Sequence, residues 1–455
     1  MSKIEVNTVE PQCGTNLTLG ANNDTVSLGT GAGFTGGIDA VKWETTPQTG
    51  SFAATAGRGY FMNTTSGALT LTLPASPSAG DIVAVKDYAL TFATNNLTIG
   101  RNSSLINGIA SDATLNTNGA ALVLVYVDGT KGWIPTQDDN SVLGASYVTA
   151  TGGTITTCGN FKIHTFTGPG TFTVSCAGNP VGSTTVDYLV IGGGAAGGGG
   201  NDGAGGGGAG GYRFSNGTAS GCYSAGPSPL GASALPVSVQ AYPIAVGGGG
   251  SSNPASATSR AGCGVASTFS TITSAGGGSG GMGDISPAPG NKDGKNGGSG
   301  GGGGTFNPGT PGQGAVGNGN TPPVSPPQGN NGGTGATDNA SYRVGGGGGG
   351  SGAVGGSVCN PAPTTGAAGG AGLASSITGS AVTRGGGGGG GGHPGGSRNG
   401  GAGGSGGGGN GARPSPATAG TANTGGGGGG SGYICGGTNS GAGGSGIVII
   451  RYRFQ

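Results

Sequence analysis

Long tracts made almost wholly of glycine fill the second half of this 455-residue chain, and they restrict what it can fold into. Glycine inside a helix costs about 1 kcal/mol per residue relative to alanine, so an α-helical bundle is excluded. A collagen-like fold is excluded as well, because the glycines form blocks instead of occupying every third position. The chain therefore needs a fold in which backbone groups, and not side chains, supply most of the contacts.

The glycines are unevenly distributed, and this predicts domain boundaries. Only 25 of the 120 glycines precede residue 191. We therefore divide the chain into an N-terminal arm over residues 1–40, a β domain over 41–140, a connector of β-strands over 141–190 and a glycine-rich domain over 191–455. The arm consists of short polar and apolar pieces that cannot form a core of their own.

Residues 41–140 carry the patterns of short β-strands. Residues 69–73 alternate leucine with threonine and stop at Pro74. Residues 82–85, 97–99 and 122–127 are further apolar or alternating segments, and Asp128-Gly129 then predicts a turn. Both tryptophans of the chain lie in this region. We expect a small β-sandwich or one subunit of an intertwined knob.

The borders of the glycine-rich domain also look like strands. Residues 160–167, 171–176 and 185–191 are expected strands, and the first two are joined by a Gly-Pro-Gly turn that lets Cys158 and Cys176 face each other. Residues 446–454 form an apolar segment at the far end of the domain. We expect this closing segment to pair with the opening one, 186–191. The predicted fold class is mainly β plus non-regular structure, with helix nearly absent.

The glycine tracts themselves are expected to order as polyglycine II helices. A flexible linker is the alternative, but apolar pieces interrupt these tracts in a way that linkers seldom show. An extended helix with three residues per turn has no internal hydrogen bonds, so its N–H and C=O groups are available to neighbours. Without Cβ atoms such helices can pack at backbone distance. We expect Gly345–Gly350 and Gly385–Gly392 to be central in this bundle and residues 400–411 to be peripheral.

The chemistry-bearing residues argue against catalysis. Glycine tracts match dinucleotide-binding fingerprints trivially, but more glycine follows the strand at 186–191 where such a site needs a helix. The glycine-rich half has no glutamate, and the chain holds only two widely separated histidines. Its seven cysteines lack the spacing of a zinc site. We expect no enzymatic activity, no metal and no cofactor, and the net charge of +1 argues against nucleic-acid binding.

Binding is better supported than catalysis. The inserts between the tracts hold the few large or charged side chains of this half, and a stiff scaffold that presents such loops suits a binding surface. The alternative is that these are ordinary solvated loop residues. The candidate receptor-binding residues are Tyr223, Asp284, Lys292, Asp293, Lys295, Phe306, His393, Arg398, Arg413 and Tyr433. The pairs Tyr212-Arg213 and Tyr342-Arg343 stand at tract edges and are interpreted as caps.

Several segments resemble tail-fibre proteins of marine bacteriophages. SKIEVNTVEPQCGTNLTLG, GRGYFMNTTSGALTLTLP and LVYVDGTKGW resemble their N-terminal half, and HTFTGPGTFTVS, VDYLVIGGG and GGSGIVIIRY resemble the glycine-rich domain of many such fibres. That domain is similar in kind to tail-fibre adhesins, in which packed polyglycine II helices carry variable loops. The resemblance implies that residues 1–40 serve oligomerisation or attachment to other tail or virion proteins, and that the inserts contact the host.

We therefore expect a receptor-binding adhesin of a phage tail fibre. It would be a homotrimer of the virion, assembled in the host cytoplasm, that recognises a host surface glycan or outer-membrane protein. The first residues lack the apolar segment of a secretory signal, and Ile447–Ile450 is too short to span a membrane. Two alternatives stay open. One is a purely structural capsid or head fibre, and the other is an ice-binding protein, which would favour regular threonine rows over the irregular inserts seen here.

Overall fold

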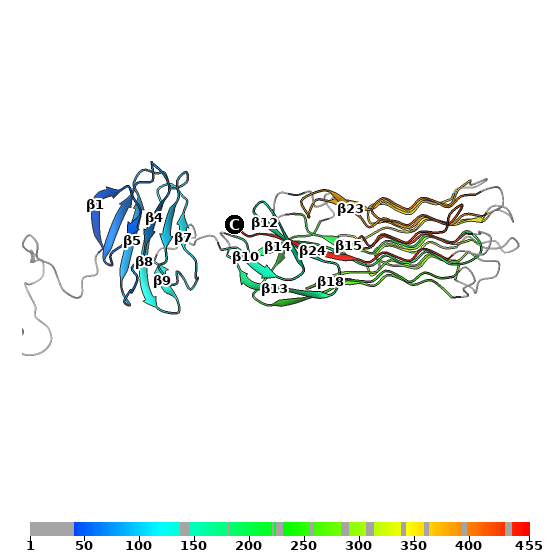
Figure 1. The fold of residues 1–455 in the computed structure, drawn as a ribbon, viewed down its shortest axis with the longest axis horizontal. Coiled ribbons are helices and arrows are strands. Elements are labelled where there is room, and N and C mark those ends of the chain that lie inside the picture. Colours follow the sequence, from blue (N-terminus) through cyan, green and yellow to red (C-terminus); the bar gives the residue numbers. More distant parts are fainter. Residues whose placement is uncertain are drawn as a thin grey trace, which may run out of the picture. The chain divides into compact units, whose positions relative to one another are not determined.

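The fold is taken from a computed structural model of the chain. It describes residues 41–455 apart from 137–145, 180–181, 218, 221–222, 224–230, 255–258, 284–290, 306–313, 338–342, 359–363, 394–397 and 433–438. The predicted arm over 1–40 lies outside the described residues. The chain divides into two compact units, residues 1–143 and 144–455 (Figure 1). All the regular secondary structure in the described ranges is β-strand. The predicted fold class, mainly β with non-regular structure, is therefore confirmed.

The first unit contains two β-sheets, and strands that follow one another in the sequence mostly belong to different sheets. The larger sheet has the order β1 (Lys42–Gln48), β3 (Arg58–Met62), β5 (Ile82–Asp87), β8 (Ala121–Asp128) and β9 (Gly132–Pro135). The smaller has the order β2 (Phe52–Ala53), β4 (Leu69–Thr72), β6 (Leu97–Gly100) and β7 (Ala113–Leu115). The chain crosses between the sheets after each of the first strands, which is why β1, β3 and β5 are parallel neighbours, as are β2, β4 and β6.

One apolar core lies between these two sheets. The leucines of the alternating segments point into it, and Leu71, Leu97 and Leu122 are fully or almost fully buried. The two tryptophans differ in environment. Trp133 is buried in this core, whereas Trp43, on the edge strand β1, is partly exposed and packs its ring 5.0 Å from that of Phe61.

The second unit begins as a sandwich of two further sheets. One sheet has the order β10 (Val148–Thr151), β13 (Gly170–Ala177), β17 (Ala241–Ala245), β18 (Ser267–Phe269) and β19 (Ile272–Ser274). The other has the order β11 (Thr154–Cys158), β12 (Phe161–Phe166), β24 (Ile447–Arg453), β14 (Thr185–Ile191) and β15 (Tyr212–Phe214), and β16 (Leu235–Pro236) also pairs with β14. The segment expected to be a connector, 141–190, is thus an integral part of the unit that carries the glycine tracts.

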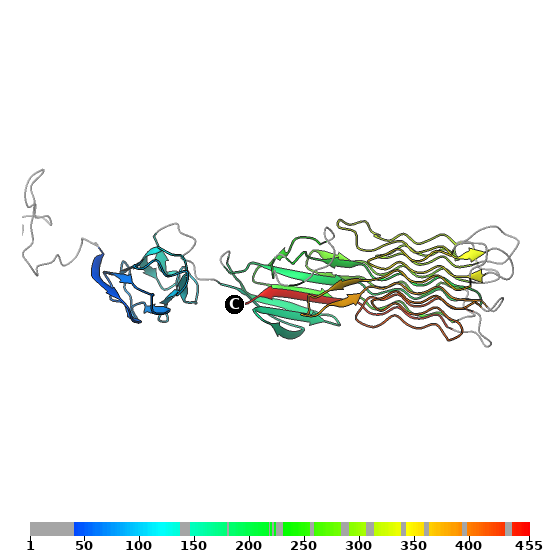
Figure 2. The same cartoon turned by 90° about the horizontal axis from the view of Figure 1, so that it is seen from above.

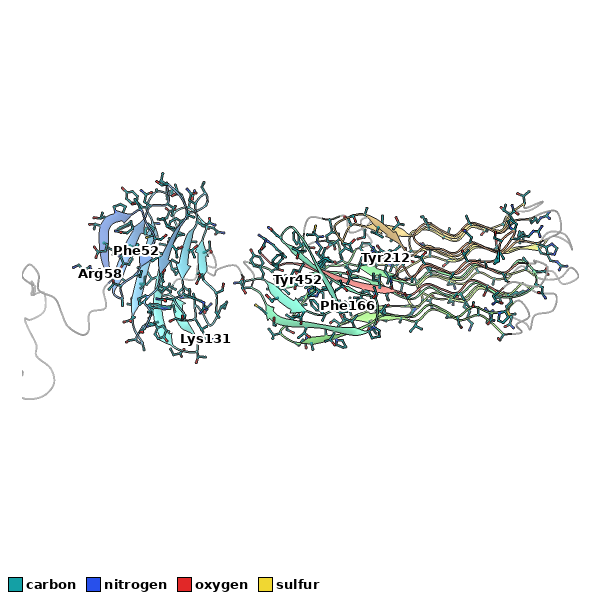
Figure 3. The ribbon with its side chains drawn as sticks, viewed as in Figure 1. Phe52, Arg58, Lys131, Phe166, Tyr212 and Tyr452 are labelled. Atoms are coloured by element: carbon teal, nitrogen blue, oxygen red, sulfur yellow. The ribbon has the colours of Figure 1, made fainter. Side chains whose placement is uncertain are left out.

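Opening and closing strands pair as the sequence predicts. β14 and β24 are antiparallel neighbours, with Leu189 opposite Ile449 and Ile191 opposite Ile447. Both strands are buried on two faces, and their hydrophobic side chains pack into separate clusters on either side of the sheet. Phe166 and Tyr452 lie among the strands, and Tyr212 lies where strands give way to glycine runs (Figure 3). The pairing therefore fixes both borders of the glycine-rich segment.

The Gly-Pro-Gly turn expected to join residues 160–167 and 171–176 does not make them neighbours in one sheet. The Gly-Pro-Gly turn leads from β12 in one sheet to β13 in the other, because apolar side chains on both strands face the common core. Cys158 and Cys176 consequently belong to different sheets, and both are free thiols. The prediction that they face each other is wrong.

Beyond the sandwich the glycine tracts run out and back as long extended segments, stacked side by side (Figures 1 and 2). Short hairpins interrupt them: β20 (Ala336–Thr337) with β21 (Arg343–Val344), and β22 (Leu373–Ser375) with β23 (Val382–Arg384). Within the described residues, no helix has the length and apolar character needed to cross a membrane.

Candidate functional site

The glycine-rich segment after β14, which we call a run like the other extended segments of the bundle, donates backbone hydrogen bonds to three neighbouring runs in turn. Residues 192, 195 and 198 donate to the run 205–211, residues 193 and 196 to 262–265, and residues 194 and 197 to 441–444. On each neighbour the acceptor moves by three residues from one bond to the next. A period of three is that of the polyproline II type of helix, whereas a β-strand has a period of two. The glycine tracts therefore form packed polyglycine II helices.

Central runs show why glycine is required. Every N–H group from Ala204 to Gly211 donates to a carbonyl of another run. A Cβ placed on Gly206 would lie 2.0 Å from the carbonyl oxygen of Gly388, and one on Gly388 would lie 2.0 Å from that of Gly428. Residues 345–350 and 385–392 are buried throughout, while 400–411 include exposed positions, as predicted. Saturated backbone bonding makes this bundle a stiff platform.

The candidate functional site is the distal end of this bundle, which we define as the end remote from β14 and β24. Here the run 192–199 reverses into 203–211. The N–H of Asp202 donates to the carbonyl of Gly283 at 2.9 Å, and the N–H of Thr305 donates to Gly203 at 3.2 Å. The hydroxyl of Ser431 donates to the carbonyl of Gly200 at 2.8 Å. Several runs are therefore joined at this reversal.

A buried group of charged side chains lies at the distal end, and we call it the Asp202 cluster: Asp202, Arg343 and His393. One carboxylate oxygen of Asp202 accepts from Nη1 of Arg343 at 2.6 Å, and the other lies 3.2 Å from Nε2 of His393. Burial alone would raise the pKa of Asp202, but the hydrogen bonds and charges of His393 and Arg343 together lower it below its usual value. The cluster thus links three separate runs through one ionised carboxylate.

Six of the ten residues predicted from the sequence lie on runs or turns near this end. Arg398 is buried and donates its N–H to the carbonyl of His393 at 3.2 Å. The carboxylate of Asp293 accepts the N–H of Ala315 at 2.7 Å, and Lys295, on the same run, is exposed. The carbonyl of Lys292 accepts from Gly304 at 2.8 Å, and that of Arg413 accepts from Gly400 at 2.7 Å. The predicted residues Asp284, Phe306 and Tyr433 are outside the described residues.

Tyr223 does not join the distal residues. Its ring lies 5.1 Å from the guanidinium carbon of Arg451, beside the strand β24, and packs on the apolar cluster around Leu189. Burial raises the pKa of Tyr223, with the nearby negative charge of Asp187 adding to the effect. Tyr223 therefore supports the sandwich and is removed from the candidate surface.

The two expected caps lie at opposite ends of the bundle. Tyr212 and Arg213 belong to β15, where a glycine run enters the sandwich. Arg343 opens a run at the distal end and binds Asp202, while Tyr342 is outside the described residues. The difference follows from the direction of the two runs. The run before Tyr212 ends at the strands of the sandwich, whereas the run that Arg343 opens starts at the distal end. Asp202 was not among the predicted site residues, although a single carboxylate inside a glycine tract is the signal that points to it.

Among the described residues, no three His, Cys, Asp or Glu side chains come together where they could hold a metal ion. The Asp202 carboxylate is engaged on both oxygens, so it joins runs and is not presented to a ligand. What faces outward near this end are lysine, arginine and polar side chains on backbone-bonded runs.

Packed polyglycine helices that grow from a β-sandwich define this unit as a glycine-rich domain. The family model described as the glycine-rich domain matches residues 164–453. The match covers more than half of the chain and includes both the sandwich strands β13, β14 and β24 and the glycine runs, so the chain belongs to this family. No curated protein matched the sequence.

Proposed function

We propose that the chain is a receptor-binding adhesin of a bacteriophage tail fibre, and that the distal end of its glycine-rich domain contacts a molecule on the bacterial surface. The observation that carries this proposal is the period of three with which successive N–H groups of a glycine run donate to its neighbouring runs. It gives a scaffold whose backbone hydrogen bonds do not depend on the exposed side chains at its distal end. Those side chains are then free to differ in chemistry without loss of the fold.

The physics of binding favours such a scaffold. Ordering a loop at an interface costs free energy, and a rigid support reduces that cost. Lys292 and Arg413 place positive charge and hydrogen-bond donors near the distal end, and Lys295 adds an exposed positive charge further along the run of Lys292. These groups suit the polar and anionic surface of a bacterial envelope. A homotrimer, which we also propose, would multiply weak contacts through avidity.

The resemblance to marine phage tail fibres supports the remainder of the proposal. It includes residues 2–20, and we propose that residues 1–40 attach the chain to other tail or virion proteins. A purely structural fibre is the competing function, and it predicts no affinity for cells.

Cell binding by the full-length protein tests the proposal. Fluorescently labelled protein is incubated with a panel of marine bacteria, and we expect saturable binding to particular strains. The double variant Lys292→Ser, Lys295→Ser should bind those strains more weakly. The matched control Lys131→Ser removes an exposed positive charge from the first unit and should bind as the wild type does. Absence of binding to every strain, or equal loss in the control, contradicts the adhesin assignment.

A further inference from the structure

A pocket of about 360 Å³ opens on the bundle surface near the distal end, between the runs 399–402 and 410–418. Its described lining includes Asn399, Asn410, Arg413, Ser415 and Thr418 together with the glycine run at 400–401. The volume suits one or two sugar rings or a short peptide tip. This pocket is separate from the buried Asp202 cluster.

Arg413 is the single charged side chain among the described residues that line the pocket. No carboxylate of the described residues forms an ion pair with it. Its Nε is buried and makes no hydrogen bond within the described part of the chain. A guanidinium without a counter-charge is costly in a partly buried place, and a ligand carboxylate would supply that charge with paired hydrogen bonds.

The backbone holds Arg413 in an unusual conformation. Its φ is +97°, in the region that residues with a side chain seldom adopt. Its N–H donates to the carbonyl of Ser415 at 2.6 Å, and its carbonyl accepts from Gly400 at 2.7 Å. Backbone strain of this kind is concentrated at ligand sites, where it fixes a side chain in advance of binding. Arg413 is thus held at the pocket from both sides.

The rest of the lining suits hydroxyl-rich ligands. The side-chain oxygen of Asn410 accepts the N–H of Gly403 at 2.8 Å, which leaves the amide nitrogen of Asn410 as a donor. Asn399 and Ser415 are exposed and add further polar groups. Pro414 and Pro416 contribute apolar ring surface to the same pocket. An apolar wall with a few convergent polar groups is the usual composition of a small-ligand site.

We propose that this pocket binds a carboxylate-bearing sugar of a bacterial surface polysaccharide, with Arg413 receiving the carboxylate. The inference rests on the proposed function, because the ligand must come from the surface that the distal end contacts. An acidic peptide is the competing ligand, but its flexible backbone has less use for the amide, hydroxyl and proline surfaces beside Arg413.

Saturation-transfer NMR with the full-length protein tests the pocket, with glucuronate, glucose and triglutamate as probes. We expect glucuronate to bind at least tenfold more tightly than glucose or triglutamate. Arg413→Gln should weaken glucuronate binding about tenfold or more, since a charge-assisted bidentate contact is lost. Ser415→Trp keeps the charge and blocks the pocket, so it should also abolish binding. Lys131→Gln removes one exposed positive charge from the first unit and serves as the matched control.

The outcomes separate the two proposals. No glucuronate binding by the wild type, equal binding of glucose, preference for triglutamate, or unchanged binding in Ser415→Trp each overturns the pocket proposal. Thermal unfolding shows whether Arg413→Gln is folded, and where it is not, Ser415→Trp decides. Strain-specific cell binding without glucuronate binding leaves the adhesin proposal standing and removes only the acidic sugar. Absence of both cell binding and glucuronate binding overturns both the adhesin proposal and the pocket proposal.

Discussion

Asp187 of β14 lies directly opposite Arg451 of β24, and both residues are almost completely buried. The two carboxylate oxygens of Asp187 accept hydrogen bonds from the hydroxyls of Ser215 and Ser220, at 2.7 and 2.5 Å. Opposed residues of an antiparallel pair share one face of the sheet, so a negative and a positive side chain lie on the same face where β14 and β24 pair. Their opposition favours this register of the two strands.

Replacing Arg451 by methionine should destabilise the second unit strongly. Arg451 donates to the carbonyl of Ile377 at 3.2 Å and lies over the rings of Phe161 and Tyr223. Its loss leaves a buried carboxylate without nearby positive charge, and we expect a cost of about 3 kcal/mol in the free energy of unfolding. Chemical denaturation measures it. Arg453→Met, at an exposed position of the same strand, is the control and should change stability by less than about 1 kcal/mol. Similar losses in both variants would refute this role of Arg451.

Alanine substitutions in the glycine runs should separate central from outer positions. A Cβ on Gly388 would meet the carbonyl oxygen of Gly428 at 2.0 Å, whereas one on the exposed Gly248 meets nothing within 4 Å. We expect Gly388→Ala to cost about 3 kcal/mol or more, because neighbouring runs must move apart and lose hydrogen bonds. Gly248→Ala should be neutral or stabilising by up to about 1 kcal/mol, because alanine restricts the unfolded chain. Melting temperatures of the two variants would coincide if the runs were not packed at backbone distance.

Much of this fold could be predicted because its signals are local. Alternating segments such as 69–73 became strands with one buried face, and glycine runs without any side chain had to satisfy their backbone groups by packing together. The pairing of 186–191 with 446–454 was also predictable, since two strongly apolar strands border a segment that offers them no other partner. The crossing from β12 to β13 between sheets was not, because the turn sequence is compatible with either outcome.

The candidate site was less predictable, because it depends on which runs become neighbours. Asp202 and Arg343 lie 141 positions apart, and neither flanking sequence indicates the other. Tyr223 also follows a glycine tract in the sequence, as the distal residues do, yet its side chain packs on a cluster of the sandwich. The pocket at Arg413 arises from two neighbouring runs and a residue with φ of +97°, which no residue pattern indicates.

Asp202→Asn should weaken the distal end in a pH-dependent manner. The pKa of Asp202 is below its unfolded value of 3.8, so its contribution to stability is present above about pH 4 and is lost as pH falls through the folded-state pKa. At pH 7 we expect a loss of about 3 kcal/mol, since Arg343 and His393 keep their positions without the carboxylate charge. The difference between variant and wild type should shrink below pH 4 in chemical denaturation. Asp293→Asn, which affects one contact to a backbone N–H, should cost only about 1 kcal/mol, and a pH-independent effect of Asp202→Asn would count against the ion pairs.

His164 sits in a hydrogen-bond chain inside the sandwich. Its Nδ1 donates to the carbonyl of Gly152 at 2.7 Å, and its Nε2 accepts from the hydroxyl of Tyr452 at 3.0 Å. That hydroxyl in turn accepts the N–H of Ala150 at 3.2 Å. This chain fixes the neutral ring, because protonation would place a second donor against Tyr452. Burial lowers the pKa of His164, although the Gly152 carbonyl acts in the opposite direction.

The second unit should therefore lose stability as the pH falls below 6.5. Below its ordinary pKa of 6.5 the histidine takes up a proton in the unfolded chain but not in the folded one, so falling pH favours unfolding. The limiting slope is about 1.4 kcal/mol per pH unit for one proton. His164→Gln should be less stable at pH 7 but flat across this window, as followed by chemical denaturation at several pH values. His393→Gln leaves the other of the chain's two histidines in place and should retain the slope. A slope that persists in His164→Gln assigns the titration to another group and removes His164 from this role.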